Sequence, residues 1–317
     1  VPLPRGLRPV FALCRAERFD GGGRAGVIKD AGDDPDVTHG LEIVAEVRAA
    51  PPGGGVRFQA GEGVGTVTLP GRARAPGEPA INPGPRAQIT AALEDAAGGP
   101  VDVTVTLSIP GGAAVAAKTH NPRLGIRGGL SVLGTTGVVV PYSCASWIHA
   151  IQRGVDVARA GGHDHILAST GRTSEQAANA DLELADEALI DMGDFAGGLL
   201  KYLRRHPVGR LTIAGGFAKM VKLGQGAMDL HSARSHVDFA RLADLARDVG
   251  GGETLVQQAR YANTAAQVLD LAGPLAPDLA RAVARRARET AMATLAGGTD
   301  VRVCVYDRQG QLRGTSS

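Results

Sequence analysis

The chain has 317 residues, of which 44% are hydrophobic and 21% charged, so it can bury a sizeable core and is not a disordered chain. Its 34 basic and 32 acidic residues leave a net charge of +2, and aromatic residues make up only 3%, so we expect no nucleic-acid or membrane partner. The 45 glycines are far above the usual share of about 7%.

Three cysteines lie far apart in the sequence, at Cys14, Cys144 and Cys304, and no CxxC pair is present. This spacing supports neither a structural zinc site nor a thioredoxin-like motif, and it suits a reducing compartment. No apolar run approaches the roughly 20 residues that cross a membrane. The opening residues, which start at Val1 and not at methionine, lack the apolar core of a signal peptide. We therefore expect a cytoplasmic protein.

Short β-prone runs between glycine- and proline-rich turns fill the first third of the chain. They predict strands over residues 7–14, 25–28, 41–47, 56–58, 64–69 and 101–109. One helix is predicted over residues 85–97, with proline at an acceptable early position. Residues 1–120 therefore predict an α+β domain dominated by strands.

The pattern changes near Asn121, and from there apolar runs alternate with helical stretches. Strands are predicted over residues 130–133, 165–168, 210–214 and 301–306. Helices are predicted from near Ser143 and over residues 174–189, 236–249 and 277–295. This alternation predicts a Rossmann-like three-layer α/β domain over residues 121–317, whose last helices are candidates for packing back on the first domain.

The densest polar cluster is KDAGDDPDVTHG, residues 29–40, which places Asp33, Asp34, Asp36 and His39 on one loop between two strands. Carboxylates this close repel one another unless a cation or a donor compensates. The loop could bind a hard cation, although without EF-hand spacing, or supply a general base. The competing interpretation is a tight turn whose carboxylates cap backbone N–H groups.

Two glycine turns are candidate ligand sites, because ligands of open α/β sheets bind at the carboxyl ends of strands. The candidate residues in these turns are Gly134, Thr135, Thr136, Gly137, Thr170 and Gly171. Plain strand-end turns are the alternative. No GxGxxG motif is present and no acid ends the second strand, although Glu175 lies just beyond, which weakens a dinucleotide interpretation. The similar GEGVGT, residues 61–66, precedes a predicted strand and favours a hairpin or bulge.

Several basic side chains stand beside turns and could hold an acidic ligand. Arg86 and Arg123 follow Asn-Pro turns, while Lys219 and Lys222 share a helical face after a glycine turn. His231 and Ser232 come shortly after. The alternatives are a solvated basic surface and, for His231, a helix cap or a packed imidazole.

Five sequence blocks follow one another along nearly the whole chain. They are KDAGDDPDVTHG at 29–40, GEGVGTVTLPG at 61–71, GEPAINPGPR at 77–86, THNPRLGIRGGLSVLGTTGVVVPYS at 119–143 and KMVKLGQGAMDLHS at 219–232. Together they closely resemble the cobalt-precorrin-5B C(1)-methyltransferase family of anaerobic cobalamin biosynthesis. The resemblance implies a two-domain α/β protein that transfers a methyl group from S-adenosylmethionine to ring carbon C-1 of a cobalt-bearing corrinoid precursor, giving cobalt-precorrin-6A.

This resemblance suggests a role for each candidate group. The donor S-adenosylmethionine is assigned to Gly134, Thr135, Thr136, Gly137, Thr170 and Gly171. The carboxylates of the corrinoid are assigned to Arg86, Arg123, Lys219, Lys222, His231 and Ser232. Proton handling after methyl transfer is assigned to Asp33, Asp34, Asp36 and His39. The cobalt arrives with the small-molecule substrate, so no protein metal site is expected.

The chain departs from the family pattern in two places. Family members usually open with a segment resembling GYTTGTCAAAA, and this sequence starts after that point. A block usually resembling GHIGK appears here as residues 215–219, GGFAK, so its histidine is absent. The rival interpretations are a dinucleotide-dependent oxidoreductase and a non-catalytic corrinoid-binding or carrier protein.

Overall fold

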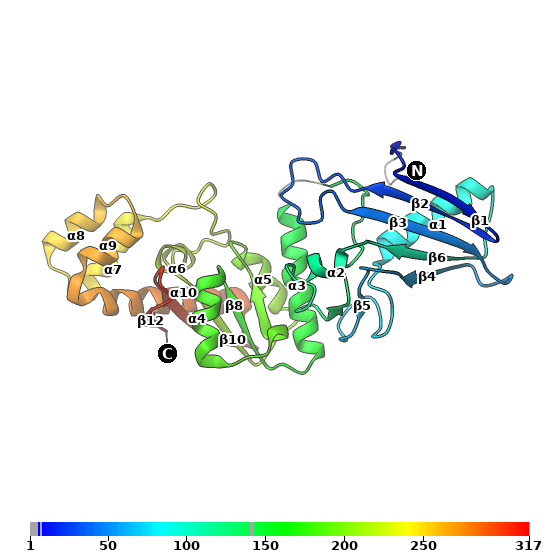
Figure 1. The fold of residues 1–317 in the computed structure, drawn as a ribbon. Helices are drawn as coiled ribbons and strands as arrows, with labels where there is room; N and C mark the ends of the chain where they lie inside the picture. Colours follow the sequence, from blue (N-terminus) through cyan, green and yellow to red (C-terminus); the bar gives the residue numbers. More distant parts are fainter. Residues whose placement is uncertain (1–5, 7, 140–142, 317) are drawn as a thin grey trace. The chain divides into compact units, whose positions relative to one another are not determined.

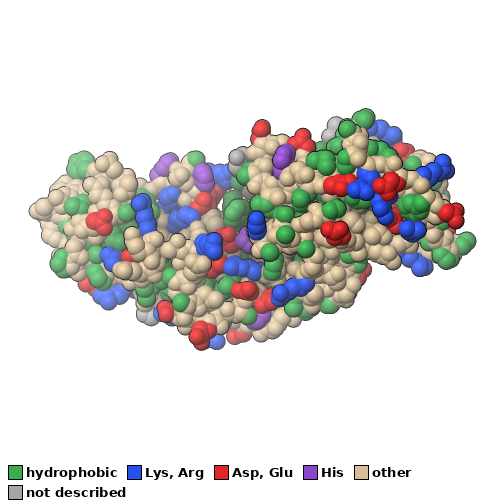
Figure 2. All heavy atoms as spheres, in the orientation of Figure 1, with side chains coloured by type: hydrophobic (Ala, Val, Ile, Leu, Met, Phe, Trp, Pro, Cys, Tyr) green, Lys and Arg blue, Asp and Glu red, His purple; other side chains and the backbone are tan. Residues whose placement is uncertain are grey.

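The computed structural model describes residues 6, 8–139 and 143–316, so the expectations for the opening residues and for residues 140–142 lie largely outside it. The chain divides into two compact units, residues 1–143 and 144–317. The predicted boundary of the folding domains, after residue 120, stays a prediction. Among the described residues, no helix is long and apolar enough to span a membrane. Side chains of both charges are interspersed over the face of each unit that Figure 2 shows.

The N-terminal unit is built on a five-stranded sheet of order β1-β2-β3-β6-β4. The strands are β1 (Arg15–Phe19), β2 (Gly22–Ile28), β3 (Glu42–Ala49), β4 (Val56–Ala60) and β6 (Val103–Ser108). All neighbours pair antiparallel except β4 and β6, which are parallel. The strand predicted over residues 7–14 is wrong for residues 8–14, because the first strand begins at Arg15.

One helix covers this sheet (Figure 1). Helix α1 (Pro83–Ala97) begins with proline and ends at Gly98, whose φ of 75° is the left-handed conformation that glycine favours. Its Ile89 and Leu93 pack against the buried cluster that contains Val105 and Leu107 of β6. The helix predicted from the sequence is therefore confirmed, with a start two residues earlier.

The rest of this unit is irregular, with short elements and close backbone contacts. It holds α2 (Gly112–Ala116) and the paired two-residue strands β5 (Thr66–Val67) and β7 (Ile126–Arg127). The strand predicted over residues 130–133 is wrong, because Leu130 and Val132 each make only a single bridge. The GEGVGT turn precedes β5 and no helix, as expected.

The C-terminal unit contains a five-stranded sheet of order β12-β11-β10-β8-β9. Its strands are β8 (His165–Ser169), β9 (Leu189–Asp191), β10 (Arg210–Gly216), β11 (Asp300–Tyr306) and β12 (Leu312–Thr315). The first four run parallel, and β12 pairs antiparallel with β11 at one edge. The α/β class predicted from the repeated strand-then-helix pattern is confirmed.

Alternate residues of the parallel strands enter two separate cores, so helices cover both faces of the sheet. On one face, Ile166, Ile213 and Val303 pack with apolar residues of α3 (Cys144–Ala160), α5 (Ala196–Leu203), α6 (Phe217–Gly224) and α10 (Ala276–Leu295). On the other face, Leu167 and Ala214 pack against Ala178 of α4 (Arg172–Leu182). Figure 1 shows α4 and α10 on either side of these strands.

One predicted helix in this unit is too long. The pattern over residues 174–189 predicts one helix, but α4 ends at Leu182 and β9 begins at Leu189. Glu183 has a φ of 50°, and the Asn179 side chain accepts a hydrogen bond from the Leu184 backbone, which together end the helix. Buried Leu189 and Ile190 then join the sheet. Helices α7 (Phe239–Asp248), α8 (Glu253–Arg260) and α9 (Ala265–Leu271) form a small lobe between α6 and α10 in the sequence.

Candidate functional site

The parallel sheet has a switch point between its adjacent strands β8 and β10. After β8 the chain crosses one face through α4 to reach β9, whereas after β10 it enters the opposite face through α6 and leads on to β11. The two connections therefore leave the sheet in opposite directions. In open α/β sheets, this is the place where ligands bind, beyond the carboxyl ends of the strands.

Lys219 joins the strand ends at this switch point. It lies in the first turn of α6, and its Nζ donates to the Thr170 carbonyl oxygen beyond β8, at 2.8 Å. The same Nζ lies 3.1 Å from Oδ1 of Asp194, which follows β9. The Lys219 and Asp194 side chains are 34% and 24% exposed, so solvent and small molecules can reach this pair.

Glycines leave the backbone around this ion pair accessible. A Cβ added to Gly171 or to Gly216 would meet nothing within 4 Å, so there is open space beside both turns. A Cβ on Gly215 would instead lie 2.7 Å from Oγ1 of Thr170 and from Cε of Met220. Gly215 thus lets the end of β10 pack closely against Thr170, beyond the end of β8. Gly216, the next residue, faces a space that a ligand can occupy.

Lys222 has a different role from Lys219. It is buried, only 8% exposed, and its Nζ donates to the Leu230 carbonyl oxygen at 3.0 Å. The Leu230 backbone N–H in turn donates to the Asp194 carbonyl oxygen at 2.8 Å. The alternative of a solvated lysine face is therefore wrong, because Lys222 braces the segment that carries Asp194.

His231 and Ser232 follow this brace and are both exposed. Nδ1 of His231 accepts a hydrogen bond from the Ala233 backbone at 3.1 Å, and the His231 backbone N–H donates to Asp229. His231 is therefore neither a helix cap nor a packed imidazole: it is exposed and closes a turn, while Asp238 caps the next helix, α7. The structure joins Thr170, Lys219 and Lys222 with this segment through one chain of contacts.

Two acidic residues at the same edge were not candidates from the sequence, although Glu175 was noted beyond the second strand. Glu175, in the first turn of α4, is 7% exposed, and its carboxylate accepts a hydrogen bond from the Ser169 hydroxyl at 3.2 Å. Asp194 was missed because no strand was predicted at β9, and the predicted helix ran to Leu189, the first residue of β9. The apolar pair Leu189 and Ile190 within β9 was the available signal.

The acidic loop lies in the N-terminal unit, between β2 and β3. Lys29 Nζ donates to the Asp36 carboxylate and to the Thr38 hydroxyl, and the Thr38 backbone N–H also donates to Asp36, at 2.8 Å. Burial acts to raise the pKa of Asp36, but these hydrogen bonds from Lys29 and Thr38 outweigh it and lower the pKa. Asp36 therefore holds the loop in shape.

The other candidates of this loop are more accessible. Asp33 and His39 are exposed and Asp34 is half-buried. His39 Nδ1 accepts a hydrogen bond from the Ala31 backbone at 3.1 Å. Among the described residues, no group of three or more His, Cys, Asp or Glu side chains is arranged to hold a metal ion. The loop is thus a turn closed by its own side chains, with His39 at its surface.

Arg86 makes its hydrogen bonds to backbone carbonyl groups of its own unit. Its guanidinium donates to the carbonyl oxygens of Ile81 and Pro79, at 2.9 and 3.2 Å, and lies over the Phe58 ring. Burial, and then the charge of Arg74, lower its pKa. Arg123 is half-buried in the turn of residues 121–125, within the same unit.

The turn of residues 134–137 is not at the carboxyl end of a parallel strand, contrary to expectation, because it belongs to the N-terminal unit. It lies against the start of α1, where a Cβ on Gly84 would be 2.5 Å from the Gly134 carbonyl oxygen. Gly134, Thr135 and Gly137 are exposed, and the Thr136 hydroxyl bonds the Val138 carbonyl oxygen. The first turn of α1 contains Pro83 and Pro85, which have no N–H, so it is a poor anion site.

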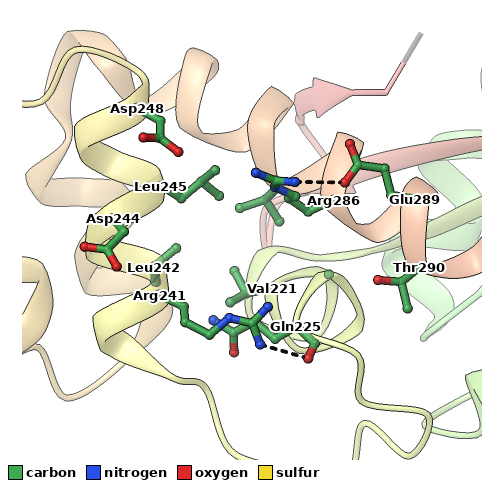
Figure 3. Close-up of a pocket in the computed structure, with 12 residues that line it drawn as sticks. Val221, Gln225, Arg241, Leu242, Asp244, Leu245, Asp248, Arg286, Glu289 and Thr290 are labelled. Carbon is green, nitrogen blue, oxygen red and sulfur yellow. Dashed lines mark hydrogen bonds and ion pairs between the residues drawn. The ribbon is translucent and has the colours of Figure 1, made fainter.

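A cavity of about 440 Å³ lies elsewhere in the C-terminal unit, between α6, α7 and α10 (Figure 3). Val221 and Leu242 line its apolar part, while Arg286 pairs with Glu289, and Arg241 donates to the Gln225 carbonyl oxygen. Both arginines are thus engaged within the protein. This cavity therefore does not gather the free positive charge that a ligand with many carboxylates needs.

Fold and site together define an α/β protein whose parallel sheet has a switch point, the place where open α/β sheets bind ligands. Residues 1–141 match the CbiD family model, and residues 229–317 match the model of the CbiD C-terminal domain. Two relatives are named cobalt-precorrin-5B C(1)-methyltransferase. The one from Brucella anthropi is 55% identical over 98% of this chain and 85% of the relative, and the one from Bradyrhizobium sp. is 58% identical over 99% and 85%.

The chain therefore belongs to the CbiD family, that of the cobalt-precorrin-5B C(1)-methyltransferases, and the resemblance of the sequence blocks is confirmed. A crystal structure of a cobalamin biosynthesis protein (cbiD) from Archaeoglobus fulgidus is 27% identical and covers 69% of this chain and 68% of that one. Its TM-score is 0.31, so the superposition does not bear on the fold.

Proposed function

We infer that this chain is an S-adenosylmethionine-dependent methyltransferase that methylates C-1 of cobalt-precorrin-5B to give cobalt-precorrin-6A in cobalamin biosynthesis. The observation that carries this inference is the identity of 55% and 58% with relatives of that name over nearly the whole chain. Family membership favours methyl transfer over the dinucleotide-dependent oxidoreductase. The substrate is a small corrinoid, its cobalt is part of the substrate, and a biosynthetic enzyme of this kind belongs in the cytoplasm.

The residues at the switch point fit a small zwitterionic donor. Open space beside Gly171 and Gly216 leaves room for a ligand close to the backbone. Oδ1 of Asp194 is buried and makes no hydrogen bond within the described part of the chain, apart from its ion pair with Lys219. The Lys219 ammonium group is thus the charged partner of this oxygen, and the two side chains present both signs of charge. The donor supplies an activated sulfonium methyl group, so the chain needs no covalent nucleophile.

The protein therefore needs to align the donor with the corrinoid and to supply the charged groups that bind them and accept a proton. We propose that Thr170 and Gly171 hold the donor, and the turn of residues 134–137 in the first unit stays a separate candidate for that role. Arg86, Arg123, Lys222, His231 and Ser232 remain candidates for orienting the corrinoid, although Arg86 and Lys222 already bond backbone carbonyls and would act mainly by shaping its site. Asp33, Asp34 and His39 are proposed to accept a proton, while Asp36 fixes their loop.

The test is incubation of the purified chain with methyl-labelled S-adenosylmethionine and cobalt-precorrin-5B. We expect label to enter the macrocycle at C-1, as seen by mass spectrometry and NMR of the product. A control without protein gives the background rate. Corrinoid binding without transfer of label would instead favour the carrier protein.

A further inference from the structure

Lys219 and Asp194 form a paired charge at the switch point that the roles assigned from the sequence do not explain. Lys219 was assigned to the carboxylates of the corrinoid. Asp194 lies 3.1 Å from its ammonium group, however, and would repel a ligand that carries many carboxylates. The pair presents both signs of charge side by side, and the ligand that complements it also carries both signs.

We propose that this pair binds the amino-acid end of S-adenosylmethionine, a deeper assignment that rests on the proposed methyl transfer. The α-ammonium group of the donor bonds the Asp194 carboxylate, and its α-carboxylate accepts from Lys219 Nζ. Oδ1 of Asp194 is buried and lies 3.1 Å from Lys219 Nζ, but the Asp194 side chain as a whole is 24% exposed, so the ammonium group approaches the carboxylate from its exposed side. Lys219, assigned to the corrinoid from the sequence, is thereby reassigned to the donor.

The surrounding structure holds both partners in place before a ligand arrives. Lys219 is fixed by its hydrogen bond to the Thr170 carbonyl oxygen at 2.8 Å. The backbone of Asp194 accepts from Leu230 N–H, and Leu230 is held in turn by buried Lys222. Such fixed charges lose little conformational freedom on binding, which favours affinity. The open side of Gly171 and Gly216 leaves room for the remainder of the donor.

The experiment compares two ligands that differ at the amino-acid end. S-adenosylhomocysteine carries the ammonium and carboxylate groups, and 5′-methylthioadenosine lacks both. Their affinities for the full chain are measured by isothermal titration calorimetry for wild type, Asp194→Asn and Lys219→Met. We expect each variant to bind S-adenosylhomocysteine roughly 10- to 100-fold more weakly, because a charged hydrogen bond contributes about 1.5–3 kcal/mol. Binding of 5′-methylthioadenosine should change less than about twofold.

Asp270→Asn is the matched control, because Asp270 is an exposed aspartate of α9 in the same unit. It should leave both affinities unchanged. Equal weakening of both ligands in Asp194→Asn, or weakening of neither, would overturn the proposal. Retained binding of 5′-methylthioadenosine also shows that a variant is folded, and if Asp194→Asn does not fold, Lys219→Met decides alone. Wild-type protein that binds no S-adenosylhomocysteine would contradict the proposed function itself, which is a separate result.

Discussion

At the scale of single residues, the structure separates side chains that build the site from side chains that build the protein. Asp36, Arg86 and Lys222 were all candidates from the sequence, because their types suit proton transfer or anion binding. Each bonds a neighbour in its own unit, and Lys222 is almost completely buried. Residue type alone cannot distinguish these cases, since burial and partners depend on the folded chain.

The stability of the N-terminal unit should depend on the charge of Asp36. Because the folded pKa of Asp36 is lowered, its contribution is full above the unfolded pKa of about 3.9 and is lost as the pH falls through the folded value. We expect Asp36→Asn to cost about 1 kcal/mol at pH 7, since it breaks the bonds with Lys29. The difference from wild type should shrink below about pH 4.

Urea unfolding of both proteins between pH 3 and 7 measures this difference. The control is Asp33→Asn, which changes an exposed aspartate of the same loop and should show little effect at any pH. A cost for Asp36→Asn that stays constant across the whole pH range would rule out the charged contact as its source.

At the scale of elements, helices are predicted best where the apolar pattern repeats over many residues, and strands are predicted best where both of their faces are buried. Helix α10 keeps one apolar face over 20 residues, and β8, β10 and β11 are rich in apolar residues and mostly buried, so all four are found close to their predicted bounds. Strand β9 has only three residues, too few to show a strand period, and it was not predicted; the predicted helix ran into its first residue, Leu189. Asp194, which follows β9, was therefore not among the candidates.

The glycines of GEGVGT are explained by close packing of backbone on backbone. Gly63 has a φ of 72°, and a Cβ there would lie 1.9 Å from the Ile109 carbonyl oxygen. Gly53 has a similar φ of 84°, but a Cβ there would meet nothing within 4 Å. We expect Gly53→Ala to cost about 1–2 kcal/mol for the left-handed backbone alone. Gly63→Ala should cost about 2–5 kcal/mol, since crowding adds to that strain.

The two variants are compared by urea denaturation of the full chain, with circular dichroism as the probe. Their shared left-handed backbone makes each the reference for the other, so the difference between them measures crowding. Equal costs at the two positions would mean that the Ile109 strand end moves away freely, and the packing explanation would then be wrong.

At the scale of the whole molecule, the candidate residues divide between the two units. The acidic loop, the two arginines and the turn of residues 134–137 belong to the first unit, whereas Thr170, Gly171 and the lysines belong to the second. The sequence could not predict this division for the 134–137 turn, because its strand-like approach and its glycines are the same as those of a true strand end.

Whether both units contribute to the donor site can be decided with Thr135 and Thr136. Thr135 is exposed, and Thr136 closes its own turn through its bond to the Val138 carbonyl oxygen. If this turn holds the donor, the double variant Thr135→Val, Thr136→Val loses hydroxyl hydrogen bonds of about 0.5–1.5 kcal/mol each. We expect its affinity for S-adenosylhomocysteine, measured by calorimetry, to fall about tenfold.

Thr254→Val, at an exposed position of α8, is the control and should bind as wild type does. An unchanged affinity of the double variant would confine the donor to the second unit, with Lys219 and Asp194, and would leave the first unit to the corrinoid.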